Sequence, residues 1–132
     1  MGECPKSWYT TEEIKEWLDK QNNIKTIIDV GAGSATYPKL LGKKYTYKAI
    51  EIWAPYIKQF NLYDYYEEIR IGDVRYIEWP EGDCIIFGDI LEHLPKEDAS
   101  IVLSKALVKY KHLILSIPLS EKEFYEGQEH YG

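Results

Sequence analysis

Short apolar runs recur along the chain and alternate with segments in which apolar residues lie three or four positions apart. The first run, from Ile24 to Val30, is rich in β-branched residues and is followed at once by Gly31, so it predicts a buried strand. Runs of the same kind predict four further strands, at residues 47–52, 69–71, 83–87 and 113–117.

The segments between these runs predict helices. Thr10 and Glu13 form a capping box, which indicates a helix over residues 10–22. Pro95 opens the most regular helical segment, where apolar side chains recur at i, i+3, i+4 and i+7 up to residue 110. Two shorter helices are expected at residues 37–42 and 55–65.

Strands that alternate with helices favour an α/β fold, with a parallel sheet covered by helices on both faces. In such sheets, ligands bind beyond the carboxyl ends of the strands. Several polar positions fall at or just after a predicted strand end: the turn from Asp29 to Ser34, Glu51, Asp73 and Asp89. We therefore expect these residues to be neighbours in space.

Length and composition favour one domain. The chain has 132 residues and a mass of 15.5 kDa, so residues 1–132 are expected to share a single core. No apolar run approaches the roughly 20 residues of a membrane helix, and the N-terminus lacks the apolar stretch of a secretory signal. Two cysteines are too few for a disulfide framework, and Cys84 is expected to be a small buried hydrophobe. These features favour a cytoplasmic protein.

The acidic residues are concentrated in the middle of the chain. The net charge is −6, and the segment from Asp64 to Asp98 holds 11 acidic and 3 basic residues. Because nucleic-acid affinity is dominated by contacts between cations and phosphates, this segment disfavours a nucleic-acid partner.

The glycine-rich segment Asp29-Val30-Gly31-Ala32-Gly33-Ser34 joins a predicted strand to a predicted helix. Gly31 permits a tight turn, and Gly33 lets a ligand approach the backbone. Glu51 lies 20 residues after Gly31, at the end of the second strand, where a carboxylate can accept hydrogen bonds from both hydroxyls of a ribose. Together they indicate an adenosine-containing ligand, whereas the glycines alone are also compatible with a simple strand–helix turn.

The identity of position 36 separates two kinds of adenosine-containing ligand. A dinucleotide fingerprint has Gly or Ala there, and this chain has Thr36, which disfavours a nicotinamide-dependent oxidoreductase. The chain resembles instead the class I S-adenosylmethionine-dependent methyltransferases. The segment Asp29-x-Gly31-x-Gly33 is similar to their motif Asp/Glu-x-Gly-x-Gly-x-Gly, with Ala35 at the third glycine.

Three later positions extend the resemblance, which runs from about residue 10 to residue 118. Glu51 is similar to the ribose-binding acid of the family, and Gly72-Asp73 to the segment that contacts the adenine amino group. The run from Asp89 to Leu94 (Asp-Ile-Leu-Glu-His-Leu) is similar to the family motif after the fourth strand. The resemblance implies a Rossmann-like three-layer sandwich with a five-stranded, mostly parallel sheet in the order 3-2-1-4-5.

The resemblance also implies S-adenosylmethionine as the cofactor and S-adenosylhomocysteine as its product. The residues expected to bind the cofactor are Asp29, Gly31, Ala32, Gly33, Ser34, Glu51, Ile52, Asp73, Val74 and Asp89. In this assignment the glycines pass close to the methionine part and Asp29 orders the turn or reaches the ammonium group. Ser34 either contacts the ligand or caps the next helix, Ile52 flanks the adenine, and Asp89 lies beside the sulfonium.

His93 is the candidate for direct chemistry, as a general base on a hydroxyl acceptor, although support of its own loop is the commoner role of such a residue. It has no companions at metal-ligand spacing, so no metal site is expected. No motif for a particular acceptor is present, and a small molecule is favoured. The alternative is a cofactor-binding or interaction module without catalytic activity.

Members of this family usually carry two more strands, which form an antiparallel hairpin at the end of the sheet. Only 14 residues follow Pro118, so we expect either a truncated chain or a fragmentary gene product, with residues 119–132 as a tail. Without the hairpin, the fifth strand is expected to be an exposed edge through which the chain associates with itself.

Overall fold

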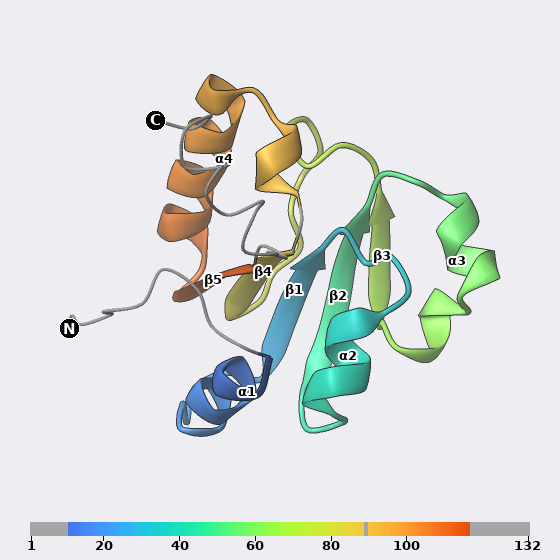
Figure 1. Ribbon diagram of the computed structural model, residues 1–132, viewed down its shortest axis with the longest axis vertical. Coiled ribbons are helices and arrows are strands. Elements are labelled where there is room, and N and C mark those ends of the chain that lie inside the picture. The colour runs from blue at the N-terminus through green and yellow to red at the C-terminus, as the bar shows by residue number, and fades with distance from the viewer. Residues whose placement is uncertain (1–10, 89, 117–132) are drawn as a thin grey trace, which may run out of the picture.

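The sheet is fully parallel. The structure, a computed structural model, describes residues 11–88 and 90–116. Its strands follow the order β3-β2-β1-β4-β5, and every neighbouring pair is parallel (Figure 1). The strands are β1 (Thr26–Val30), β2 (Thr46–Glu51), β3 (Glu68–Ile71), β4 (Cys84–Gly88) and β5 (His112–Ser116). The α/β class, the parallel sheet and its strand order are therefore confirmed.

The central strand is buried on both faces. β1 pairs with β2 on one side and with β4 on the other, so that Asp29 lies between Ala49 and Ile86. Ile27 and Ile28 point to opposite faces of the sheet and are both fully buried. A continuous β-branched run, rather than an alternation of apolar and polar residues, is what a strand covered on both faces requires.

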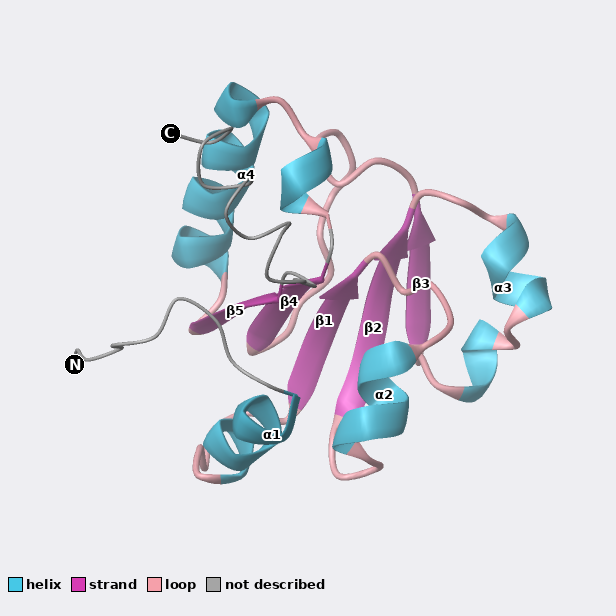
Figure 2. Ribbon diagram, viewed as in Figure 1, coloured by secondary structure: helices cyan, strands magenta, loops and turns pink. Residues whose placement is uncertain are grey.

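Helices cover the two faces as two separate layers (Figure 2). The helices are α1 (Thr11–Asp19), α2 (Thr36–Leu41), α3 (Pro55–Gln59) and α4 (Lys96–Lys109), with 3-10 turns η1 (Leu62–Asp64) and η2 (Leu91–His93). Ile14 and Leu18 of α1 belong to the core on the same face as α2. Val102 and Ala106 of α4 belong to the core on the other face, with Phe87 of β4. The three-layer arrangement is thus confirmed.

Three predicted boundaries were wrong. The first helix ends at Asp19 rather than at residue 22, and Thr10 of the capping box lies outside the described residues. β1 begins at Thr26 rather than at residue 24, because the Lys25 amide, just before it, donates to the Asp83 carboxylate (2.9 Å). The helix expected over residues 55–65 stops early because Asn61 adopts a left-handed backbone (φ 53°), which ends the helix before η1.

β5 lies at one edge of the sheet. Among the described residues it pairs only with β4, and Leu115 remains 46% exposed. The tail at residues 119–132 lies outside the described part of the chain. Cys84 is completely buried in β4, as expected. No helix in the described part is both long and apolar enough to cross a membrane.

Candidate functional site

The glycine turn is built from left-handed residues. After β1 ends at Val30, Gly31 and Gly33 have φ values of 81° and 54°, and α2 begins at Thr36. The Gly31 amide donates to the Ile50 carbonyl (2.8 Å), which ties the start of the turn to β2. Left-handed backbone is cheap only for glycine, so the sequence prediction of a tight turn is confirmed.

The two glycines have different surroundings. A β-carbon built on Gly31 would lie 2.6 Å from Cδ1 of Ile90, so Gly31 makes room for the loop that follows β4. A β-carbon built on Gly33 would meet nothing closer than the Gly31 carbonyl oxygen, at 4.0 Å. The space beside Gly33 is therefore open to a ligand, whereas the space beside Gly31 is filled by the protein.

Three small residues complete the turn. Ala35, at the position of the third motif glycine, has φ 64° and is completely buried. Ala35 is also the residue that precedes α2, and no side chain caps that helix, so of the two roles left open for Ser34 the structure does not show the cap. The Ser34 hydroxyl lies instead 3.5 Å from that of Thr36. Ala32 is buried in the core.

Glu51 connects β2 to the glycine turn. The residue is only 3% exposed, its Oε1 accepts a hydrogen bond from the Gly33 amide (3.0 Å), and its Oε2 accepts one from the Trp53 amide (2.9 Å). An ionised carboxylate has about four acceptor positions, so one remains on each oxygen. Two adjacent hydroxyl donors, as on a ribose, match that remaining capacity.

Asp29 lies buried beneath the turn. It is 1% exposed, and its Oδ2 accepts a hydrogen bond from the Tyr66 hydroxyl (2.5 Å). Its Oδ1 is also buried and has no hydrogen-bond partner in the described structure. Burial raises the pKa of Asp29 to about 7, while the Tyr66 hydrogen bond opposes the rise and the charge of Glu51 adds to it.

Asp73 follows β3 and is held by an arginine. Arg75 donates to Asp73 from its side chain (Nε to Oδ1 at 3.0 Å, Nη2 to Oδ2 at 2.8 Å) and from its backbone amide (2.9 Å to Oδ1). Nη1 of Arg75 also contacts Asp98 of α4 (2.7 Å). The hydrogen bonds from the Arg75 side chain lower the pKa of Asp73. Oδ2 has a single donor and keeps capacity for one more.

Apolar side chains border the ends of β2 and β3. Ile52 is 64% exposed, and Trp53 and Ile71 are also exposed. Such exposed apolar side chains beside Glu51 and Asp73 suit the flat face of a base. Val74, in contrast, is buried, and its carbonyl accepts a hydrogen bond from the Trp79 indole (2.9 Å), so only its amide is a candidate for ligand contact.

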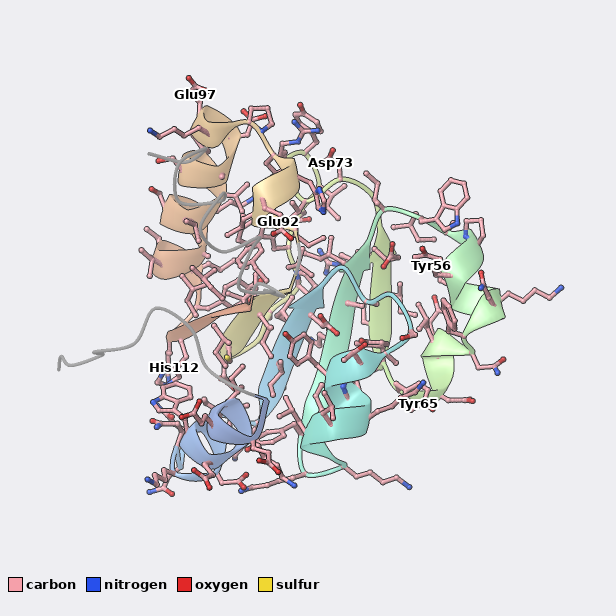
Figure 3. The ribbon with its side chains drawn as sticks, in the orientation of Figure 1. Tyr56, Tyr65, Asp73, Glu92, Glu97 and His112 are labelled. Atoms are coloured by element: carbon pink, nitrogen blue, oxygen red, sulfur yellow. The ribbon has the colours of Figure 1, made fainter. Side chains whose placement is uncertain are left out.

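The loop after β4 reaches the same end of the sheet. Figure 3 places Glu92 and Asp73 there, whereas His112 lies at the opposite end, near α1. His93 has a side chain that is 74% exposed, and its Nε2 lies 3.9 Å from Oε2 of Glu92. Asp89 lies outside the described residues. Within the described ranges no cluster of three His, Cys, Asp or Glu side chains is placed to hold a metal ion.

Sequence reasoning missed two partners of the site acids. Tyr66 is one of 12 tyrosines and directly follows the helix predicted at residues 55–65, so nothing marked it. Arg75 follows Asp73 by two residues, a spacing at which a side chain can fold back, but the contact to Asp98 depends on where α4 packs.

Comparisons with known proteins point to one fold. The sequence matches no protein-family model and no curated protein. The amino pentose methyltransferase CalS10 from Micromonospora echinaspora, solved with S-adenosylmethionine bound, aligns over 89% of this chain and 54% of its own, with a TM-score of 0.67 and 12% identity. The chain has the fold of a class I S-adenosylmethionine-dependent methyltransferase.

Two further methyltransferases share this fold. The magnesium protoporphyrin IX methyltransferase ChlM from Synechocystis PCC 6803 aligns over 92% of this chain and 66% of its own, with a TM-score of 0.64 and 17% identity. A putative RNA methyltransferase from Pyrococcus horikoshii aligns over 91% and 63%, with a TM-score of 0.62 and 18% identity. The chain thus spans between about half and two thirds of these proteins, whose acceptors differ widely.

Proposed function

We propose that this chain binds S-adenosylmethionine at the carboxyl ends of β1, β2 and β3 and transfers its methyl group to a small-molecule acceptor. The observation that carries the proposal is Glu51: a buried carboxylate at the end of β2, fixed to the Gly33 amide, with one free acceptor position on each oxygen. The open space beside Gly33 is the second requirement, because a ligand must approach the backbone there.

Each part of the ligand has a proposed partner. Glu51 accepts hydrogen bonds from the two ribose hydroxyls, and Oδ2 of Asp73 accepts one from the adenine amino group, with the Val74 amide beside it. Ile52 packs on a face of the adenine. Gly31, Ala32, Gly33 and Ser34 form the cradle for the methionine part, Asp29 supplies negative charge beneath it, and Asp89 is proposed to lie near the sulfonium.

The cofactor, when bound, supplies an electrophilic methyl group for in-line transfer to an acceptor lone pair. The protein's contribution is to align the methyl donor with the acceptor and to exclude water. Alignment of two reactants supplies a large share of the rate enhancement in transfers of this kind. His93 remains the candidate base, and its exposed side chain can accept the acceptor's proton and pass it to solvent. The acid excess of the segment from Asp64 to Asp98 disfavours a phosphate-rich acceptor, which supports a small molecule.

The alternative is cofactor binding without methyl transfer. Incubation with methyl-labelled S-adenosylmethionine and a panel of small hydroxyl, amine and thiol compounds separates the two. Label that moves to one compound, and that requires Glu51, supports the enzyme. Tight binding of S-adenosylhomocysteine with no transfer to any acceptor class supports a cofactor-binding module without catalytic activity. Binding of NAD, with no binding of S-adenosylmethionine or S-adenosylhomocysteine, contradicts both functions.

A further inference from the structure

Tyr66 and Asp29 form a buried pair beneath the glycine turn. Tyr66 is 2% exposed and lies between η1 and β3, far from the turn in sequence. Its hydroxyl donates to Oδ2 of Asp29, two residues before Gly31, and leaves Oδ1 buried with no partner among the described residues. A buried carboxylate with one oxygen satisfied and one not is costly, and such a group usually has a use.

Among the described residues, the groups that face Asp29 do not neutralise it. Besides Tyr66, the neighbours that interact with it electrostatically are the Glu51 carboxylate and the Tyr47 hydroxyl, and neither is a cation. The pKa of Tyr66 is raised above its usual range by burial and by the charge of Asp29, so its hydroxyl stays protonated and remains a donor. The compensating positive charge is therefore expected to come from a ligand on the turn above.

We propose that Tyr66 is a positioning residue for the cofactor: its hydroxyl fixes the Asp29 carboxylate beneath the glycine turn, where the charge of this buried carboxylate attracts the ligand's ammonium group. This inference rests on the proposed function. The hydrogen bond from Tyr66 stabilises the ionised form of Asp29. Tyr66 therefore sets the pH above which Asp29 carries the charge that attracts the methionine end of the ligand. The adenosine end, held by Glu51 and Asp73, does not depend on the pair.

Two ligands separate the two ends of the site. S-adenosylhomocysteine carries the ammonium group, whereas 5′-methylthioadenosine has the same nucleoside and no amino-acid part. Neither ligand changes its charge between about pH 5.5 and about 8, so a pH dependence confined to the first ligand reports a group on the protein. Calorimetry of both ligands across this range measures the effect.

Wild-type affinity for S-adenosylhomocysteine is expected to rise with pH as Asp29 ionises, and affinity for 5′-methylthioadenosine is expected to stay flat. Tyr66→Phe removes a hydrogen bond to the carboxylate, so the rise moves to higher pH by about one unit and affinity near neutral pH falls by up to about tenfold. Asp29→Asn abolishes the pH dependence. Tyr45→Phe is the matched control, because its hydroxyl donates to Asp19 (3.1 Å) rather than to Asp29, and it leaves both curves unchanged.

The outcomes are distinct. If Tyr66→Phe weakens both ligands equally, or neither, or leaves the pH curve in place, the positioning role is overturned while the proposed function stands. Binding of 5′-methylthioadenosine shows in the same experiment that the variant is folded. If folded wild-type protein binds neither ligand, the proposed function itself is contradicted, and the role of Tyr66 falls with it.

Discussion

A methyl group added at Gly33 should weaken ligand binding while leaving the fold in place. In the structure, a β-carbon at Gly33 has nothing within van der Waals reach except one carbonyl oxygen at 4.0 Å, so Gly33→Ala creates no clash. Its cost to stability comes from the left-handed backbone (φ 54°), which penalises alanine by about 1–2 kcal/mol. For a domain of this size, each 1 kcal/mol lowers the melting temperature by about 3–6 °C, so the variant stays folded at room temperature.

The same methyl group occupies the space through which the ligand approaches the turn. We expect Gly33→Ala to weaken S-adenosylhomocysteine by at least about tenfold, or about 1.4 kcal/mol. Gly42→Ala is the matched control, because Gly42 ends α2 with φ 91° and a β-carbon there meets nothing within 4 Å. Both variants therefore carry backbone strain without a clash, and only the first lies at the site.

Thermal unfolding and calorimetric titration of the two variants, beside wild type, test the reasoning. Gly31→Ala adds a contrast, since its β-carbon would lie 2.6 Å from Ile90 and crowding costs about 1–3 kcal/mol beyond the backbone strain. We expect wild type to be the most stable and Gly33→Ala the next, because the backbone of Gly42 (φ 91°, ψ −177°) lies in a region nearly restricted to glycine and Gly31→Ala adds crowding. If Gly33→Ala binds the ligand as tightly as Gly42→Ala does, the ligand does not approach Gly33 and the assignment of the turn is refuted.

Three further predictions concern other parts of the chain. The pKa of Asp29 is raised to about 7, so the folded protein binds this proton more tightly than the unfolded chain does. The free energy of unfolding should therefore fall by up to about 4 kcal/mol as the pH rises from about 4 to 7. Urea unfolding of Asp29→Asn across the same pH range should not show this fall. Asp98→Asn removes one partner of Arg75 from a half-exposed pair, so stability should change by no more than about 1 kcal/mol, and a larger loss on thermal unfolding would show that the pair does more than tether α4. The exposed edge at β5 predicts self-association, so the mass measured by light scattering should rise with protein concentration. The variant Leu115→Lys should remain a monomer. A constant wild-type mass, together with strong hydrogen-exchange protection of the β5 amides, would show that the edge is covered.

The sheet was predictable because its strands carry a strong signal. The run from Ile24 to Val30 has few polar positions, and right-handed crossovers leave few ways to order five parallel strands. The site followed from topology: Glu51 and Gly33 meet because parallel strands end at the same edge. Topology predicts that the two residues are close, but the hydrogen bond between them depends on the exact path of the turn, which the sequence does not encode.

The remaining details depend on tertiary contacts that no local pattern encodes. The break at Asn61 is a local choice between helical and left-handed backbone, and the flanking apolar residues are compatible with either. The hydroxyl on Asp29 comes from Tyr66, which is indistinguishable in sequence from the other tyrosines of its segment. The start of β1 shifted because a side chain, Asp83, takes the Lys25 amide, which a longer strand would have used.

Calorimetric titration of S-adenosylhomocysteine into the wild-type protein and Glu51→Ala tests the central claim most directly. The account predicts saturable binding at one site per chain, weakened by about 1–3 kcal/mol in the variant through the loss of charge-assisted hydrogen bonds to the ribose. Glu51→Gln, which keeps an oxygen for one of the two backbone amides, should fall between them. No detectable binding to folded wild-type protein, or equal binding by Glu51→Ala, would contradict it.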